Sequence, residues 1–212
     1  MTNDSEQNNY LNDPDVRLML EVKGGSVLAF EELMAKNQNH VQVILMNLLG
    51  NWQLAEDLTQ EVFFRIYKTR EKYTPNAAFS TWLYRIVHNL AFNAIRSRGR
   101  HPELLFGSKP RHTLNESSDS CAMENLIPAR SAQIPTRQIA QKEIQVIVQQ
   151  AIQSLNERQR MAILLNRFEG MNYQEIAEVM DLSLDAVKSL LCRARINLKE
   201  ALTPYVQEGR MM

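Results

Sequence analysis

The chain has 212 residues, enough for one large domain or two small ones with modest cores. Its 24 basic residues balance 24 acidic ones, and because a protein that binds DNA tightly by itself is usually basic, the zero net charge argues against autonomous DNA binding. Cys121 and Cys192 lie in unrelated contexts, which indicates a reducing cytoplasm rather than a disulfide scaffold. The polar N-terminus and the lack of a long apolar run predict a cytosolic protein with no leader and no membrane insertion.

Apolar residues recur with helical periodicity through the first hundred residues, where four helices are expected. Ser26 and Ser80 are placed to cap the second and the fourth of them, and Gly50 is placed to end the second. The expected helices run from Pro14 to Gly24, from Ser26 to Gly50, from about Ala55 to Ile66 and from Thr81 to about Ser97.

The third and fourth of these helices differ sharply in charge. The third carries Glu56, Asp57 and Glu61, whereas no acidic residue occurs from Lys72 to Pro102. Basic and aromatic residues interleave in that acid-free stretch, which is typical of surfaces that contact nucleic-acid backbone and unstacked bases. The acidic helix would repel DNA, so it is predicted to face a basic protein partner, with a plain solvated face as the alternative.

One face of the fourth helix is expected to bring together Arg85, Asn89, Phe92 and Arg96, which follow one another at spacings of three and four residues. An outward aromatic beside two arginines favours a functional role for Phe92. Trp82 is left open between a contact surface and the core, because burial is the commoner fate of an aromatic side chain.

Residues 101–136 have no helical periodicity and contain Pro102, Pro110, Pro128 and Pro135, so they are predicted to be a flexible linker. Helical periodicity returns in the C-terminal part of the chain. The sequence therefore predicts an all-α protein with two small helical domains, 1–100 and 137–212.

The C-terminal domain contains a helix-turn-helix pattern over about residues 172–199. Asn172 and Glu175 form a capping pair for a short helix, and residues 181–183 turn the chain into a longer one. No acidic residue occurs on that second helix between Asp185 and Glu200, so its outward face is basic. Such a helix can enter the major groove, where arginine pairs with guanine and lysine holds phosphate, although a helical hairpin with a solvated basic face is the plainer alternative.

Three segments in this order resemble the small extracytoplasmic-function (ECF) sigma factors, members of the sigma-70 family of bacterial RNA polymerase. Residues 54–67, LAEDLTQEVFFRIY, are similar to the polymerase-binding helix of that group, and residues 79–100 are similar to its promoter-melting helix. Residues 154–202 resemble its C-terminal DNA-reading domain. The resemblance covers about 26–100 and 137–205 and implies a factor that binds core polymerase and directs promoter-specific initiation.

The resemblance also implies which residues make each contact. The first set would grip core RNA polymerase and comprises Glu56, Asp57, Gln60, Glu61 and Arg65. The second would recognise and open the downstream (−10) promoter element and comprises Phe79, Ser80, Trp82, Arg85, Asn89, Phe92, Asn93 and Arg96. The third would read the upstream (−35) element and comprises Leu184, Asp185, Lys188, Ser189, Arg193 and Arg195.

The linker is long enough for this role. Promoter elements two DNA turns apart are separated by roughly 70 Å, and 36 extended residues reach roughly 120 Å. Partners implied by the resemblance are core polymerase, promoter DNA and a separate anti-sigma protein, since no room for a fused inhibitor is expected after Pro204.

Other function classes fit the sequence less well. No nucleophile-base order, phosphate-binding glycine loop or pair of catalytic carboxylates is present, so no enzyme activity and no cofactor are expected. The four histidines have no ligand spacing, so no metal site is expected. A free-standing helix-turn-helix regulator remains an alternative and would form two-fold dimers on palindromic sites, and a protein-interaction adaptor is the third possibility.

Overall fold

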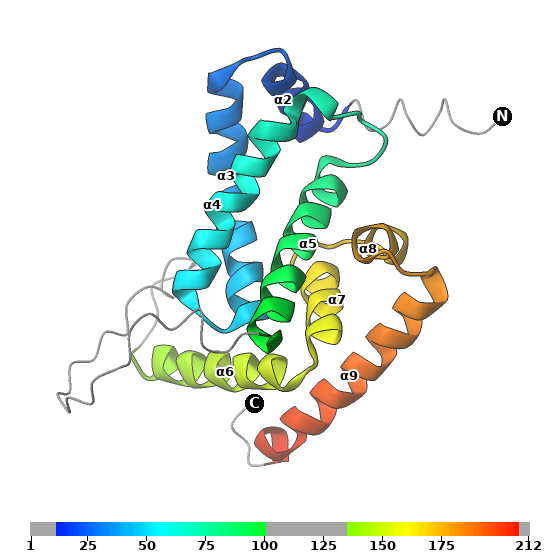
Figure 1. Cartoon of the computed structure of the whole chain (residues 1–212). Helices are drawn as coiled ribbons and strands as arrows, with labels where there is room; N and C mark the ends of the chain where they lie inside the picture. Colours follow the sequence, from blue (N-terminus) through cyan, green and yellow to red (C-terminus); the bar gives the residue numbers. More distant parts are fainter. Residues whose placement is uncertain (1–11, 101–134, 208–212) are drawn as a thin grey trace.

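The computed structural model describes residues 12–100 and 135–207, and within these ranges the chain consists of helices and short connections without strands (Figure 1). The helices are α2 (Pro14–Lys23), α3 (Val27–Leu49), α4 (Trp52–Thr69), α5 (Phe79–Arg100), α6 (Pro135–Ser154), α7 (Glu157–Arg167), α8 (Tyr173–Met180) and α9 (Leu184–Gln207), with a 3-10 turn, η1 (Arg70–Lys72), after α4. The predicted all-α class is confirmed. Except for the first two residues of α6, the expected linker over 101–136 lies outside the described residues. None of the described helices is both long and apolar enough to cross a membrane.

The helix signals at Ser26, Gly50 and Asn172 act as expected. The Ser26 hydroxyl accepts a hydrogen bond from the Ala29 N–H at 3.2 Å, and Gly50 ends α3 in the left-handed region with φ 66°. At α8, Asn172 and Glu175 form a complete capping box. These ends need only residues close in sequence, so the sequence suffices to predict them.

The expected cap at Ser80 is wrong, because α5 begins at Phe79 and Ser80 already lies inside the helix. The carboxylate of Asp13, 66 residues earlier, accepts the Phe79 N–H at 3.4 Å through Oδ2. Its other oxygen accepts the Asp15 N–H at 2.9 Å and caps α2. One carboxylate therefore serves the starts of two helices, and it ties α2 to the first turn of α5.

Helices α2 to α5 form the N-terminal block. They bury one apolar face each, as their spacing predicts, and α3 packs against α2, α4 and α5. The buried side chains at the centre of the block include Met19, Leu33, Ile44, Leu45, Leu48, Val62, Ile66, Leu83 and Val87.

Helices α6 to α9 form the C-terminal block, which is organised around the buried guanidinium of Arg160. Its three nitrogens donate to four main-chain oxygens at 2.5 to 3.1 Å. Two of these acceptors lie in the last turn of α6 and a third, Leu155, directly follows it, while the fourth is the Leu48 oxygen at the end of α3. Buried arginine is costly unless its donors are satisfied, and here the orphan carbonyls of two helix ends satisfy them.

The two blocks pack against each other and share one apolar core. Figure 1 shows α7 and α8 beside α5, with α6 crossing below the ends of α3 and α5. The closest association between the blocks is that of α5 with α8, and α3 touches both α6 and α7. The sequence predicts two blocks but gives no sign of this docking.

Candidate protein and nucleic-acid interfaces

Helix α4 presents the predicted acidic face to solvent. Its buried stripe includes Ala55, Val62 and Ile66, and this stripe fixes the rotation of the helix against α3 and α5. The expected polymerase-binding residues therefore lie together on the surface, with Glu61 half-buried and the others exposed; they are Glu56, Asp57, Gln60, Glu61 and Arg65. Within this face, Arg65 Nε donates to Glu61 Oε1 at 2.8 Å.

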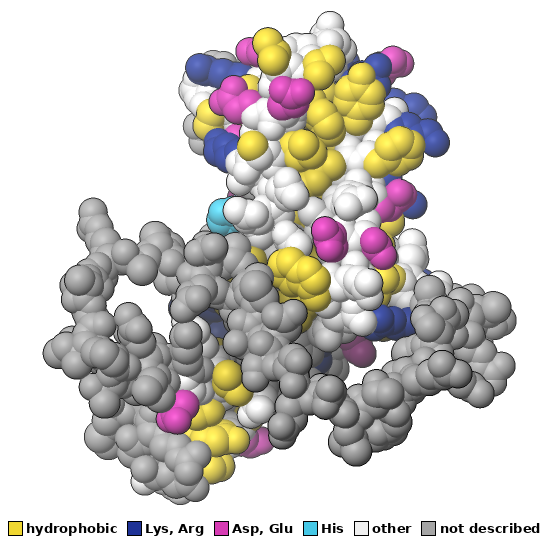
Figure 2. Space-filling model, turned by 90° about the vertical axis from the view of Figure 1, so that its left-hand side faces the viewer, with side chains coloured by type: hydrophobic (Ala, Val, Ile, Leu, Met, Phe, Trp, Pro, Cys, Tyr) yellow, Lys and Arg dark blue, Asp and Glu magenta, His cyan; other side chains and the backbone are white. Residues whose placement is uncertain are grey.

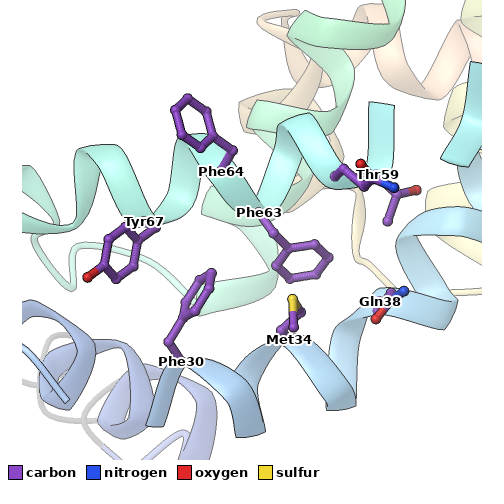
Figure 3. A pocket seen from close by; sticks show the side chains of 8 residues that line it. Phe30, Met34, Gln38, Thr59, Phe63, Phe64 and Tyr67 are labelled. Atoms are coloured by element: carbon purple, nitrogen blue, oxygen red, sulfur yellow. The ribbon is translucent and has the colours of Figure 1, made fainter. Parts of the chain in front are cut away.

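An apolar hollow of about 290 Å³ lies beside this acidic face, between α3 and α4 (Figure 3). In Figure 3, Phe30 of α3 faces Tyr67 of α4, and Phe63 points toward Met34. The Phe30 and Tyr67 ring centroids are 5.1 Å apart. Phe64 stands at the rim with 59% of its surface exposed. Tyr67, at the same hollow, is also exposed, so the two rings extend the apolar surface of the hollow to solvent. A contiguous apolar surface with a charged border is typical of a site that binds a partner.

Sequence reasoning missed this hollow, although one signal for it was available. The i, i+3, i+4 stripe of α4 runs through Val62 and Ile66, which leaves Phe64 pointing outward. Figure 2, which looks onto the side of the molecule formed by α3 and α4, shows hydrophobic side chains gathered on the upper block with acidic and basic side chains around them. An apolar centre with a charged rim is the usual anatomy of a protein-protein interface.

The α5 residues expected to contact the downstream element fall into two groups. Arg85, Asn89, Asn93 and Arg96 are exposed on one side of the helix, with Phe92 half-buried among them. Arg96 Nε donates to the Phe92 main-chain oxygen at 3.3 Å. This side therefore presents cations, amides and one aromatic ring, the combination that binds phosphates and unstacked bases.

The other group lies at the start of α5 and is packed into the protein. Phe79 is fully buried, while Ser80 and Trp82 are half-buried. Trp82 packs edge-on against Tyr73 with ring centroids 5.0 Å apart, and Phe79 lies 5.9 Å from Trp82. This aromatic cluster fixes the loop before α5, and burial raises the pKa of the Tyr73 hydroxyl to about 12.

The helix-turn-helix is formed by α8 and α9. Asp181 makes the turn in the left-handed region with φ 53°, and the Ser183 hydroxyl accepts the Ala186 N–H at 3.2 Å to start α9. Val187, Leu191 and Ala194 are buried. Every residue expected to read the upstream element is exposed on the remaining surface of α9, namely Leu184, Asp185, Lys188, Ser189, Arg193 and Arg195.

Two of the exposed cations on α9 have partners within the block. Lys188 Nζ lies 3.1 Å from Asp185 Oδ1. Arg195 Nη2 donates to the Tyr173 hydroxyl at 3.0 Å and to Asn166 Oδ1 at 3.4 Å. Arg193 is also exposed, but the helical rotation of about 100° per residue turns it well away from Lys188 and Arg195 around the helix axis. Among the described residues, no group of histidine, cysteine and carboxylate side chains is arranged to hold a metal ion.

Comparison with known proteins identifies both helical blocks. The model of Sigma-70 region 2 matches residues 33–101, and that of Sigma-70, region 4 matches residues 145–198. The chain is 33% identical over 197 residues to the "RNA polymerase sigma-H factor" of Pseudomonas aeruginosa, which spans 93% of this chain and 98% of that relative. It is 30% identical over 192 residues to the "ECF RNA polymerase sigma-E factor" of Haemophilus influenzae, which spans 91% and 97%.

Two solved structures share the fold. CnrH, in complex with the cytosolic domain of CnrY, has a TM-score of 0.62 and 21% identity and covers 90% of this chain and 97% of its own. The sigma factor RpoE of Bartonella quintana, in complex with the anti-sigma factor NepR, has a TM-score of 0.60 and 20% identity, with coverages of 84% and 98%.

A Sigma-70 region 2 match followed by a Sigma-70 region 4 match on one chain defines a sigma factor, which directs promoter-specific transcription initiation. The chain belongs to the sigma-70 family of RNA polymerase sigma factors, in its extracytoplasmic-function group.

Proposed function

We propose that the chain binds core RNA polymerase through α3 and α4 and reads two promoter elements, the downstream one with α5 and the upstream one with α9. The observation that carries this assignment is the order of three different exposed surfaces on one chain. An acidic and apolar face comes first, a cationic and aromatic face second, and a basic helix-turn-helix third.

The polymerase contact combines charge with burial. The exposed carboxylates of Glu56 and Asp57 suit a basic partner surface and steer its approach. The adjacent hollow, with Phe64 at its rim, supplies apolar area that a helix of the partner can cover. Zero net charge then fits a protein that draws most of its DNA affinity from a larger machine.

The two promoter contacts have different roles: α9 reads the sequence of the upstream element, and α5 helps to open the downstream element. On α9, Arg193 is placed to read a base pair and Lys188 to hold phosphate. On α5, Phe92 and Asn89 are placed to capture an unstacked base, with Arg85 and Arg96 on the backbone. Phe79 and Trp82 shape the preceding loop from within the aromatic cluster.

Three further points belong to this proposal. The chain acts without catalysis of its own, in the cytoplasm where polymerase works. A separate anti-sigma protein restrains it, in line with the partnered states in which the CnrH and RpoE structures were solved. Co-purification from unstressed cells tests this restraint, and a stoichiometric helical partner is expected.

The decisive experiment is reconstitution of the full chain with core RNA polymerase. The expected result is a one-to-one complex on gel filtration that protects both elements of a promoter in footprinting. Failure to co-elute with polymerase, together with dimers that bind a palindromic DNA site, would instead support the free-standing regulator.

A further inference from the structure

The two blocks are held together by hydrogen bonds at the face of α5 that we assign to DNA. Arg85 donates from Nε and Nη2 to the main-chain oxygen of Glu178 in α8, at 3.2 and 2.9 Å. Two donors of a proposed DNA-binding arginine are therefore engaged by the other block. Helix α8 lies alongside α5 at this point (Figure 1).

A second contact joins the end of α3 to α6 and α7. Gln153 Nε2 donates to the Asn47 oxygen at 2.7 Å, and Arg160 Nη1 donates to the Leu48 oxygen at 2.8 Å. Both acceptors are in the last turn of α3, whose carbonyls have no partner within the helix. The C-terminal block therefore completes a helix end of the N-terminal block.

A third contact centres on Glu169, in the connection between α7 and α8. Its Oε1 lies 3.3 Å from His40 Nδ1 of α3. The same carboxylate lies close enough to Tyr84 of α5 that, after burial, it is the next cause of the raised pKa of the tyrosine hydroxyl. Glu169 thus contacts α3 directly and acts electrostatically on Tyr84 of α5, at a distance from the contact at the end of α3.

We infer that this arrangement is a closed, self-blocking state, in which α8 occupies part of the α5 surface required for the downstream promoter element. The inference rests on the proposed function. Two promoter elements two DNA turns apart hold the two reading surfaces roughly 70 Å from each other. In the closed state those blocks are in contact, so the chain cannot read both elements, and the blocks must separate before a promoter opens.

A reversible crosslink tests this directly in the full chain. Cys121→Ser and Cys192→Ser first remove the native thiols. His40→Cys and Glu169→Cys then place two thiols where side-chain atoms lie 3.3 Å apart, and a short bismaleimide with a disulfide in its spacer joins them. The control pair is His40→Cys with Lys199→Cys, and Lys199 is an exposed residue of α9. Figure 1 shows α9 and α3 on different sides of the molecule.

The 40–169 pair is expected to crosslink much faster than the control pair. With core polymerase, the crosslinked chain should lose at least tenfold in permanganate reactivity of promoter thymines, and reduction of the spacer should restore it. Equal crosslinking rates for the two pairs, or full promoter opening by the crosslinked chain, would overturn the inference. If the reduced chain opens no promoter, the proposed function fails, while the crosslinking rates still decide whether the closed state exists.

A single substitution gives an independent check. Gln153→Ala removes one hydrogen bond between the blocks and touches none of the proposed binding surfaces. It should lower the equilibrium constant for closure about three- to tenfold, which slows the 40–169 crosslink and raises promoter opening at limiting chain concentration. Gln150→Ala, an exposed change on the same helix, is the matched control. A Gln153 variant indistinguishable from the Gln150 variant in both measurements would contradict the closed state.

Discussion

The Tyr173 hydroxyl accepts a hydrogen bond of 3.0 Å from Nη2 of Arg195, and the guanidinium lies 6.0 Å from the centre of the tyrosine ring. Tyr173 begins α8 and Arg195 lies near the middle of α9, so the contact braces the two helices of the helix-turn-helix. Arg195 is thereby held in place before DNA arrives, whereas Arg193, two residues earlier, is exposed on a different side of the helix. The two arginines should therefore behave differently when each is replaced.

Arg193→Ala should cost about 1–3 kcal/mol at one matched base pair of the upstream element and abolish discrimination there. Lys188→Ala should weaken all sequences alike, because a phosphate contact carries no sequence information. Transcription from a library of upstream-element variants measures both effects. Lys199→Ala, which removes the same charge farther along α9, is the control, and an unaltered preference profile for Arg193→Ala would exclude this helix as the reader.

Asp57→Lys should weaken assembly with core polymerase by roughly 2–5 kcal/mol, because it sets a cation against the expected basic surface. Asp57 is exposed, so the fold should be unaffected. Glu143→Lys makes the same charge change at an exposed site on α6 and should leave assembly intact. Equal affinities of the two variants in a polymerase titration would rule out the acidic face as the docking site.

Phe64→Ala tests the hollow next to that face. Because 59% of the ring is exposed, its removal should change the free energy of unfolding by less than about 1 kcal/mol. Burial against polymerase would make the same ring an anchor, so the affinity should fall by about 2 kcal/mol or more. A variant that is less stable but binds polymerase normally would place Phe64 in the fold instead of in the interface.

The double variant Asn89→Ala, Phe92→Ala should assemble with polymerase normally and still fail to open promoters. Stacking on an aromatic ring contributes about 1–3 kcal/mol per base, so open-complex formation should drop at least tenfold. Permanganate footprinting reports the opening, and gel filtration reports the assembly. If promoter thymines react with permanganate in the variant as strongly as in the wild type, this side of α5 has no role in promoter melting.

Stability should decline in mild acid because of His88. Burial, reinforced by the charges of Arg158 and Arg96, lowers the pKa of this imidazole. The unfolded chain then binds the proton at a higher pH than the folded chain, so stability is lost as pH falls below the ordinary value of about 6.5. Thermal unfolding between about pH 7.5 and 5.5 should show this slope, and His88→Gln should flatten it. If the stability of the His88→Gln variant depends on pH as steeply as that of the wild type, another titrating group must cause the effect.

Local signals carried most of the fold prediction. The Ser26 cap, the Gly50 stop and the capping box at Asn172 depend on neighbours in sequence, and all three are confirmed. The prediction of a cap at Ser80 was wrong because the first N–H of α5 is bound by Asp13, at the start of α2, and a contact between residues so far apart in sequence cannot be predicted from local signals. Burial of Phe79 depends in part on a similar contact, because Tyr73 reaches it through the course of the loop before α5.

The interfaces were predictable to a different degree. Charge patterning placed the acidic face of α4 and the basic face of α9 on the surface, because charged residues avoid burial. The hollow beside α4 was not predicted, since it needs Phe30 of α3 opposite Tyr67 of α4. The docking of the blocks was beyond sequence reasoning as well, because its main acceptors, such as the oxygens of Leu48 and Glu178, are backbone atoms that every sequence possesses.

Those backbone acceptors also determine how the closed state responds to salt. Arg85 and Gln153 bond to neutral main-chain oxygens, so added ions screen these contacts only weakly. Promoter binding, in contrast, releases condensed counterions and weakens steeply as salt rises. The closed state and the DNA-bound state, which compete for the surface of α5, therefore differ in their sensitivity to salt. Higher ionic strength weakens the binding of α5 to DNA more than its contact with α8.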